Sequence, residues 1–515
     1  MDTVFSISIS EMGDFMSAEK TKKGRPLFAD MYSFSMAQGY FLNRMDQNVV
    51  FDMFFRRQPF GGGFTIFAGL EEVVDEILNI RFSPQDMAYL ESLGVFKKTF
   101  LDFLKGFRFK GDIYAMREGT AVFPNEPLIR IHGTLMETQL IEGMLLNYIN
   151  FQSLIATKSA RIVLAANGGR VVEFGLRRAH GVDGAISGTR AAYIGGAFAT
   201  SNMEAGRKLG IPVAGTMAHS WVMSFETELE AFEKYAEIYP DSCVLLADTY
   251  DTLNSGTPNA ARVLGRLKKK GKKNFGIRLD SGDLEYLSKE SRKILDKNDL
   301  KEAVIFASNE VDEWIIKHLV RENAAIDAWG VGTKLITGDQ DPSLTGVYKL
   351  SAKQGPKGWV PRMKITNNPE KMSNPGVKEA HRFYDPHGHA LGDLICLAGE
   401  EPGLLKKIKS RKPIRFCHPS VDFFEFNLQG YAEAKKLLNP IVSKGERVGP
   451  PTPLPDIQKT AADELESLDA TYKRLINPHI YKVSVSRRLK KEKKALIKKA
   501  LERRPGGASP GKATD

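Results

Sequence analysis

Residues 170 to 335 alternate between two kinds of segment, and this alternation constrains the fold more than any other feature of the chain. Six short apolar runs of β-type residues recur there: RVVEF, IPVAGTM (211–217), CVLLA, NFGIRL, AVIFA and AIDAWGV. Helical patterns lie between several of them, at 228–239, 261–273, 283–297 and 312–323. Strands that alternate with helices of about 10–15 residues are typical of βαβ units. The sequence therefore predicts an α/β fold around a parallel sheet.

Polar residues gather at the ends of these apolar runs. In a βα barrel the carboxyl ends of all strands meet at one face, which holds the active site. An open doubly wound sheet gathers its ligand groups at a single switch point instead. The polar ends are spread over all the runs, so an irregular βα barrel is favoured. The residues concerned are Glu173, Arg177, Arg178, His219, Asp248, Arg278, Asp280, Ser308, Asn309, Gly330, Gly332 and Thr333.

The regions on either side of this alternation differ from it. An amphipathic helix is expected at 28–41, and β-structure around a basic pair and a glycine turn at 49–69. The stretch 450–455, PPTPLP, is typical of an extended linker. We expect five parts: a disordered leader (1–23), a separate N-terminal α/β domain (24–150), the barrel (151–350), a C-terminal segment packed on both domains (351–486) and a basic tail (487–515).

The positive charge is concentrated in the tail. The whole chain carries a formal charge of +11, and residues 487–515 contain eleven Lys or Arg against three Asp or Glu, which is +8 of that total. The rest of the chain is nearly balanced. A basic helix with a solvated face followed by a Pro/Gly-rich end is favoured over a tether to RNA or anionic lipid. We expect no nucleic-acid partner.

Cysteine usage and hydropathy indicate the compartment. The three cysteines are widely spaced and form no C-x-x-C pair, which argues against a disulfide framework or a zinc knuckle. No run approaches the roughly 18 apolar residues of a membrane span, and the N-terminal stretch lacks the basic flank of a secretory signal. We therefore expect a cytoplasmic protein with no membrane partner.

Several of the polar strand ends suit a phosphorylated sugar. Arginine forks such as those of Arg177 and Arg178 bind phosphate bidentately, and the closely spaced glycines of WGVGTK (329–334) can cradle a phosphate with backbone N–H groups. Asp280 and Asp283, on a Ser-Gly turn, suit ribose hydroxyls or Mg²⁺. Each feature also has a purely structural interpretation: surface arginines, a plain turn, and helix N-capping by Asp283.

The most unusual residue is His219, in GTMAHSW (215–221). A histidine beside phosphate-binding groups and a carboxylate can act as a general base or as a nucleophile that accepts a phosphoryl group. A buried core histidine is the structural alternative. A zinc site with His180 is conceivable, but the spacing matches no metal-ligand motif.

Long motifs of the chain resemble a known family. These are 173–225 (EFGLRRAHG to MSF), LLADTYDTLNSG (245–256), IRLDSGDL (277–284), GVGTKLITG (330–338), ADMYSFSMAQGYF (29–41), FFRRQPFGGGF (54–64) and PRMKITNNPEKMSNPG (361–376). In this order they closely resemble the nicotinate phosphoribosyltransferase family, from about residue 24 to about residue 490.

The resemblance implies a reaction and its partners. Nicotinate and phosphoribosyl pyrophosphate would give nicotinate mononucleotide and pyrophosphate, with Mg²⁺, in NAD salvage. The fold implied is that of the type II phosphoribosyltransferases, an irregular α/β barrel joined to an α/β domain and assembled as a homodimer. The resemblance also implies that ATP is a co-substrate and that His219 is transiently phosphorylated, as a phosphohistidine whose turnover drives the synthesis.

The resemblance further implies roles for individual residues. Phe174 should stack on one face of the pyridine ring and Tyr32, from the neighbouring subunit, on the other. Arg278 should lie against the ring or its carboxylate. Asp280 should hold the ribose hydroxyls, with Asp248 near the reacting centre, and Asp280 and Asp283 are the candidate Mg²⁺ ligands. The other implied substrate-binding positions are Arg177, Gly332 and Thr333 for the 5′-phosphate, Ser220, Asn309 and, across the dimer, Arg57.

Substrate choice leaves alternatives open. Related nicotinamide enzymes carry an aspartate where this chain has Ser201-Asn202. An aspartate would repel nicotinate, whereas serine or asparagine can donate a hydrogen bond to it, which favours the acid as substrate. The alternatives are a nicotinamide or quinolinate phosphoribosyltransferase, and a non-catalytic barrel protein associated with RNA or membranes.

Overall fold

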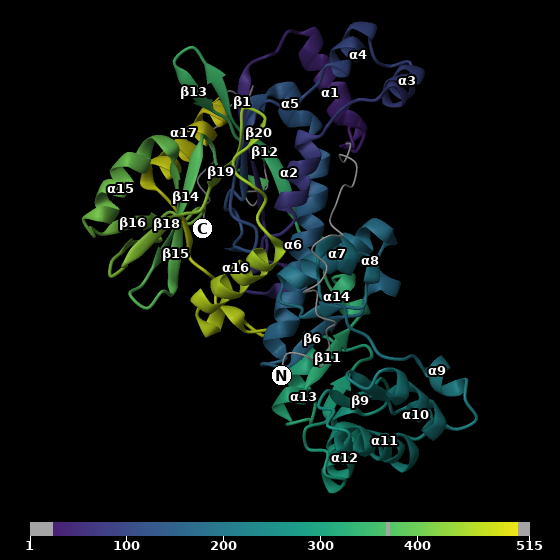
Figure 1. Cartoon of the computed structure of the whole chain (residues 1–515). Helices are drawn as coiled ribbons and strands as arrows, with labels where there is room; N and C mark the ends of the chain where they lie inside the picture. The colour runs from purple at the N-terminus through teal and green to yellow at the C-terminus, as the bar shows by residue number, and fades with distance from the viewer. Residues whose placement is uncertain (1–23, 367–370, 503–515) are drawn as a thin grey trace, which may run out of the picture.

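The computed structural model describes residues 24–366 and 371–502. The predicted leader and the end of the basic tail lie outside the described residues. Helix α6 (Glu142–Ala165) joins two parts of the molecule, with an antiparallel sheet near its start and a parallel sheet near its end (Figure 1). At about 1.5 Å per residue, its 24 residues span roughly 36 Å.

The parallel sheet has the strand order of a barrel that has not closed. The order is β7-β6-β11-β10-β9-β8, and every neighbouring pair is parallel. The first strand, β6, lies beside the last, β11, as in a barrel, whereas the consecutive strands β7 and β8 form the two open edges. The predicted irregular βα barrel is therefore confirmed as a curled half-barrel. Its strands are β6 (Arg170–Glu173), β7 (Ala199–Thr200), β8 (Cys243–Leu246), β9 (Phe275–Leu279), β10 (Val304–Ala307) and β11 (Ala328–Val331).

The strand predicted at 211–217 is wrong. Only Val213 pairs there, in an isolated parallel bridge with Thr200 at the open edge of the sheet. Pro212 interrupts the run, and a proline has no N–H to donate to a ladder. His219 therefore does not end a strand. It is the first residue of the short helix α9 (His219–Met223), which follows an irregular segment.

Helices cover the outer face of the half-barrel, and the four predicted between its strands are confirmed. Side chains alternate along each strand, so Leu245, Ile277 and Trp329 point outward and join a core cluster with Leu264 and Ile316 of the helices. The helices are α7 (Gly181–Ile194), α8 (Met203–Leu209), α10 (Glu228–Ile238), α11 (Thr257–Lys269), α12 (Leu284–Lys297), α13 (Glu313–Arg321) and α14 (Thr333–Ile336).

The N-terminal region forms an antiparallel sheet that later parts of the chain complete. Its order is β13-β12-β1-β5-β3-β19-β20, so three segments distant in sequence share one sheet. The helix predicted at 28–41 is α1. The elements are α1 (Met31–Leu42), β1 (Asn48–Phe55), β2 (Thr65–Ile66), α2 (Leu70–Leu78), α3 (Pro84–Ser92), α4 (Lys98–Lys105), β3 (Asp112–Ala115), β4 (Ala121–Val122), β5 (Ile129–Thr134), α5 (Leu135–Leu140), β12 (Gly346–Gly355), β13 (Gly358–Pro361), β19 (Asn439–Ser443) and β20 (Glu446–Arg447).

A third sheet, of order β17-β16-β21-β15-β14-β18, builds the C-terminal segment. Helix α16 packs on α7 of the half-barrel, and α17, the predicted basic helix, packs on β15 and β16. The elements are β14 (Lys378–Tyr384), β15 (Ala390–Leu397), α15 (Glu401–Lys409), β16 (Ile414–Cys417), β17 (Glu425–Leu428), β18 (Glu433–Lys436), α16 (Leu454–Ser467), β21 (Val483–Val485) and α17 (Arg487–Glu502).

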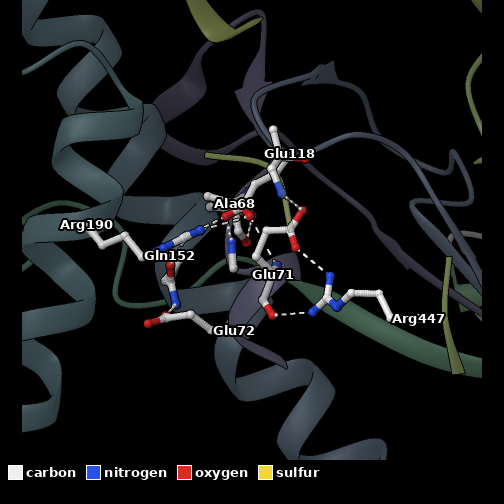
Figure 2. A network of polar contacts seen from close by, with 10 residues as sticks. Ala68, Glu71, Glu72, Glu118, Gln152, Arg190 and Arg447 are labelled. Atoms are coloured by element: carbon white, nitrogen blue, oxygen red, sulfur yellow. Dashed lines mark hydrogen bonds and ion pairs between the residues drawn. The ribbon is translucent and has the colours of Figure 1, made fainter. Parts of the chain in front are cut away.

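A network of polar contacts joins the half-barrel to the antiparallel sheet and its helices (Figure 2). Arg190 of α7 donates to both carboxylate oxygens of Glu118, at 2.5 and 3.0 Å. Glu118 also accepts from the backbone N–H of Glu71, and Glu71 accepts in turn from Arg447 of β20 at 2.7 Å. Burial opposes the charge of Glu118, but the guanidinium of Arg190 outweighs it and lowers the pKa of that carboxyl. The network fixes the half-barrel against the antiparallel sheet.

Within residues 24–366 and 371–502, every helix is too short or too polar to cross a bilayer. Cys243, Cys396 and Cys417 are all buried free thiols.

Candidate active site

The candidate site lies at the carboxyl ends of the parallel strands, which we call the mouth of the half-barrel. Val172, Val244 and Phe306 form a small apolar cluster on the inner face of the sheet. Because side chains alternate with a period of two, residues an even number of positions further along face the same side. Phe174, Asp248, Arg278, Asp280 and Ser308 all follow this rule at the strand ends. The alternation therefore places these five side chains close together at the mouth.

Arg278, on β9, is the most connected side chain of the mouth. Its Nε donates to Ser308 Oγ at 2.8 Å, and one terminal nitrogen donates to Thr216 Oγ1 at 3.1 Å. The other donates to Asp280 Oδ1 at 2.8 Å. The side chain is only 13% exposed, so these bonds fix the guanidinium in one orientation.

An aromatic wall lies beside this guanidinium. The ring centroids of Phe174 and Phe306 are 5.5 Å apart, and the guanidinium carbon of Arg278 lies 5.5 Å from the Phe174 centroid. Gly330 makes room for the wall, since a Cβ there would lie 2.6 Å from the Phe174 ring. The mouth thus offers a flat apolar surface next to a cation.

His219 reaches across to the same cluster from α9. Its Nδ1 lies 3.2 Å from Thr249 Oγ1, and its Nε2 lies 3.6 Å from Asp280 Oδ2. The imidazole is 40% exposed, which excludes the interpretation as a buried core histidine. One nitrogen faces a hydroxyl and the other a carboxylate, so the ring is oriented but remains accessible.

Two carboxylates sit behind this histidine. Asp248 Oδ2 accepts from the backbone N–H of Asp280 at 2.9 Å and from Ser281 Oγ at 2.6 Å. Asp248 Oδ1 is buried and has no hydrogen-bond partner among the residues that the structure describes. Burial works against the charged form of Asp280, but Arg278, Ser308 and His219 together hold the pKa of its carboxyl below the ordinary value. Asp280 is therefore ionised at neutral pH.

The expected phosphate-binding residues also lie at the mouth. Arg177 is exposed in a single turn, Leu176–Arg178, that contacts α14. Gly332 precedes α14 and Thr333 begins it, with Thr333 Oγ1 donating to Glu310 at 3.0 Å. Asn309, after β10, is exposed and has a φ of 109°. Ser220 lies beside His219 in α9 and is also exposed.

Other expected residues have different surroundings. Asp283 accepts from the Tyr286 N–H as the N-cap of α12, and its role toward Mg²⁺ stays a prediction. Asn202 is buried and caps α8, so only Ser201 of the Ser-Asn pair is available to a ligand.

The two residues expected from a second subunit do not join the mouth of their own chain. Tyr32 belongs to α1, which lies near the opposite end of the molecule from β9 (Figure 1). Its side chain is beside Glu142, and burial and that carboxylate raise the pKa of its hydroxyl to about 12. Arg57 is 67% exposed and pairs with Asp341 at 3.3 Å.

The sequence did not predict the contacts of three hydroxyl groups that organise the mouth. Thr249, Thr216 and Ser281 contact His219, Arg278 and Asp248 respectively. Ser281 and Thr249 each directly follow a predicted site aspartate, which was the available signal. Thr216 was expected at the rim of the site as a polar neighbour of His219, but its bond to Arg278 was not predicted.

This fold defines an α/β protein with a curled parallel sheet, and its candidate site lies at the carboxyl ends of the strands. Three family models cover most of the chain: the nicotinate phosphoribosyltransferase N-terminal domain matches residues 27–150, the nicotinate phosphoribosyltransferase family matches 170–353, and its C-terminal domain matches 377–493. The chain belongs to the nicotinate phosphoribosyltransferase family.

Individual relatives agree with this assignment. The chain is 42% identical over 464 residues to nicotinate phosphoribosyltransferase of Bacillus subtilis, covering 89% of this chain and 92% of that one. It is 33% identical to the human nicotinate phosphoribosyltransferase, covering 92% and 96%. The crystal structure of human nicotinic acid phosphoribosyltransferase superimposes with a TM-score of 0.77 at 30% identity, over 92% of this chain and 100% of that one.

Proposed function

We propose that this protein transfers the phosphoribosyl group of phosphoribosyl pyrophosphate to nicotinate, giving nicotinate mononucleotide and pyrophosphate, in NAD salvage. The observation that carries the proposal is the position of Arg278 between the aromatic wall of Phe174 and the ionised Asp280. A flat aromatic ring that carries a carboxylate can stack on Phe174 and place its carboxylate next to the guanidinium of Arg278. A ribose matches the neighbouring carboxylate. The family membership of the chain agrees with both.

The nicotinate ring is proposed to stack on Phe174 with its carboxylate toward Arg278. A buried arginine makes charge-assisted hydrogen bonds to a carboxylate that are about twice as strong as neutral ones. Ser201 is the available hydroxyl donor at the end of β7. The cation and this donor favour the acid over its amide as substrate.

The sugar phosphate is proposed to lie across the remaining strand ends. Asp280 accepts from the ribose hydroxyls, while Arg177 with the backbone of Gly332 and Thr333 binds the 5′-phosphate. As pyrophosphate leaves, the ribose ring becomes positively charged, and the carboxylates of Asp248 and Asp280 stabilise that charge. Positioning and preorganised electrostatics of this kind need no covalent help from the protein.

The mouth has donors that suit Mg²⁺. The buried Asp248 Oδ1 has no hydrogen-bond partner within the described part of the chain, and the ionised Asp280 is the residue whose backbone N–H binds the other oxygen of Asp248. Mg²⁺ is commonly held by one or two carboxylates together with substrate phosphates and water. Asp248 and Asp280, with Asp283 as the further predicted ligand, would hold the ion, which would neutralise charge on the departing pyrophosphate.

His219 is proposed to couple the reaction to ATP. Its accessible imidazole nitrogen attacks the γ-phosphorus of ATP, so that an N–P bond forms, a P–O bond breaks and ADP leaves. Water later hydrolyses the phosphohistidine to inorganic phosphate. A phosphoryl group adds about −1.5 to −2 charge at neutral pH, here beside Asp280. This charge would alter the binding of pyrophosphate and favour its release.

The active site is proposed to be shared between two copies in a homodimer. Tyr32 and Arg57 do not join the mouth of their own chain, and Tyr32 is 47% exposed. In a dimer Tyr32 of one copy would cover the open face of the nicotinate ring held by the other.

The experiment that tests this function measures nicotinate mononucleotide formation with and without ATP. Wild type should form product in both cases and faster with ATP, and His219→Ala should form product that ATP no longer accelerates. The exposed His318 of α13 provides the control, because His318→Ala should keep the full ATP effect. If wild type forms product at the same rate with and without ATP, the proposed phosphohistidine step is wrong. The proposed phosphoribosyl transfer to nicotinate would still be supported.

A further inference from the structure

A cavity of about 500 Å³ lies at one end of the antiparallel sheet, between the end of α4, the start of β3, the end of β5 and the strand β13. We call it the Trp359 pocket after the side chain that β13 contributes. Its volume is in the range of small-molecule sites. Helix α4 and strand β13 lie at the opposite end of the molecule from β9 (Figure 1), and none of the residues proposed for the transfer reaction lines this cavity.

The Trp359 pocket offers an accessible aromatic surface. Trp359 is 38% exposed and is the most exposed of the four tryptophans of the chain. Its indole centroid lies 5.5 Å from the imidazole centroid of His132, in an edge-on contact. Phe103 and Phe107 line the same cavity, with their centroids 6.4 Å apart. Because every nucleobase has a flat π-face, an accessible indole in a cavity suits the stacking of a base.

His132 contributes a polar atom that lacks a partner. Its Nε2 is buried and makes no hydrogen bond within the described part of the chain. Burial and the nearby Arg130 lower the pKa of the imidazole to about 4, so the ring is neutral at neutral pH, with one N–H donor and one acceptor nitrogen. Buried polar groups are ordinarily hydrogen-bonded. The polar edge of a heterocycle in the pocket would supply the partner.

Positive charge gathers at the rim of the Trp359 pocket. The cations that line it are Arg108, Lys110 and Lys444. In residues 24–366 and 371–502, none of these three forms an ion pair with a carboxylate. Arg81 lies close by: burial and, after it, repulsion by Arg108 lower the pKa of the Arg81 guanidinium. The rim therefore suits an anionic group.

The two carboxylates of the lining are bound by the backbone. Glu137 accepts from the N–H of Lys110 at 2.7 Å and from the N–H of Thr134 at 2.8 Å. Asp112 accepts from the N–H of Lys444 at 2.7 Å. These bonds fix the main chain of both lysines at the cavity, while their ammonium groups stay without a carboxylate partner.

We propose that the Trp359 pocket binds a nucleoside monophosphate. The base stacks on Trp359 and meets the unpartnered nitrogen of His132, and the phosphate lies among the three cations of the rim. A flat ring and an anion are required together, because the cavity combines an aromatic surface with uncompensated positive charge. This site is additional to the one proposed for nicotinate and phosphoribosyl pyrophosphate, and it does not depend on that function.

The test titrates the full chain with adenosine monophosphate and follows both tryptophan fluorescence and heat. Wild type should show a fluorescence change, because the base covers Trp359. Trp359→Phe keeps an aromatic ring, so its calorimetric affinity should stay within about threefold of wild type while the fluorescence change disappears. Trp359→Ala should bind about tenfold more weakly. Adenosine and inorganic phosphate, which each carry one half of the ligand, should both bind at least about tenfold more weakly than the nucleotide.

A matched pair of lysines tests the rim. Lys110→Gln should weaken binding by about five- to tenfold, the size expected for one charge-assisted bond. Lys357 is exposed in the turn before Trp359 but does not line the cavity, so Lys357→Gln should bind like wild type. Unfolding temperatures equal to that of wild type, measured without nucleotide, establish that each effect is local.

Three results would overturn the proposal. The first is an absence of binding to wild type at nucleotide concentrations up to about 1 mM. The second is a fluorescence change that persists in Trp359→Phe, which would place the nucleotide elsewhere, for example at the mouth. The third is equal affinity of Lys110→Gln and Lys357→Gln. None of these measurements needs turnover, so their outcome is separate from that of the proposed function.

Discussion

His219 Nε2 lies 3.6 Å from Asp280 Oδ2, and this pair joins a helix at the open edge of the half-barrel to the carboxyl end of its strand β9. The same aspartate binds Arg278 through its other oxygen at 2.8 Å. Asp280 therefore connects the residue proposed to carry phosphate with the residue proposed to hold nicotinate. A negative charge added to His219 therefore acts electrostatically on Asp280 and on the proposed substrate site beside it.

Asp280→Asn should reduce kcat by about 100-fold or more, the loss typical of removing one preorganised electrostatic group. Because Arg278 and its neighbours hold the pKa of Asp280 below its ordinary value, the carboxylate is charged throughout the neutral range. Wild-type activity should accordingly show no loss from protonation of this group until the pH falls below the ordinary range of an aspartate. Initial rates of both proteins across the acidic range check this. A variant with wild-type kcat would contradict the role given to Asp280.

Gly330→Ala should raise KM for nicotinate by about tenfold. The new Cβ would lie 2.6 Å from the Phe174 ring and 2.8 Å from that of Phe306, so the aromatic wall must shift. Overpacking of this kind costs about 1–3 kcal/mol. The KM for phosphoribosyl pyrophosphate should change little, and saturation kinetics with each substrate measure the difference.

The control for this variant is Gly265→Ala. A Cβ at Gly265, inside α11, meets nothing within 4 Å. It should leave both KM values unchanged and stabilise the helix by up to about 1 kcal/mol. An unchanged nicotinate KM in Gly330→Ala would show that Phe174 does not bind the ring.

Arg190→Met should destabilise the protein by about 3–5 kcal/mol, because it leaves the buried carboxylate of Glu118 without its partner. The double variant Arg190→Met with Glu118→Gln should recover part of this loss. Chemical unfolding of wild type, the two single variants and the double variant gives the coupling free energy between the two residues. A single variant as stable as wild type would mean that this network does not hold the half-barrel against the antiparallel sheet.

His132, on β5, should make the protein sensitive to acid. Burial and the nearby Arg130 lower its pKa from 6.5 to about 4 in the folded state. Between these values the unfolded chain binds a proton that the folded chain does not, so stability falls as the pH drops from 6.5 toward 4. At about 1.4 kcal/mol per unit, the loss at about pH 4.5 is roughly 3 kcal/mol.

Urea unfolding of wild type and His132→Phe measures this effect. The phenyl ring can take the place of the imidazole between Tyr114 and Trp359 without titrating. From about pH 7 to about pH 4.5 the variant should gain roughly 3 kcal/mol relative to wild type. A constant difference between the two proteins would exclude His132 as the acid-sensitive group.

The sequence predicted those parts of the fold that local pattern determines. The helices that became α10 to α13 have strong apolar periodicity, and the polar ends of β8 to β11 lie at the mouth as expected. The strand predicted at 211–217 was wrong because the composition of this run is typical of a strand, whereas Pro212 has no N–H for a hydrogen bond between strands. The pairing of β1 with β12 depends on tertiary contact between segments about 300 residues apart, which no local pattern records.

The candidate site was predictable to a similar extent. Aspartates and arginines at strand ends stand out in a sequence, and alternation along the strands then brings them together. The contact of Thr249 with His219 depends on where α9 docks against the half-barrel. This contact is set by the tertiary structure, and no local pattern records it.

The reaction and the pyridine substrate together define the function proposed for this protein. The most direct measurement supplies the purified protein with phosphoribosyl pyrophosphate, Mg²⁺ and either nicotinate, nicotinamide or quinolinate, and follows the nucleotide product and the released pyrophosphate. The account predicts nicotinate mononucleotide and an equal amount of pyrophosphate from nicotinate, with little product from the other two. Preferential turnover of nicotinamide or quinolinate, or no nucleotide from any of the three, would contradict it.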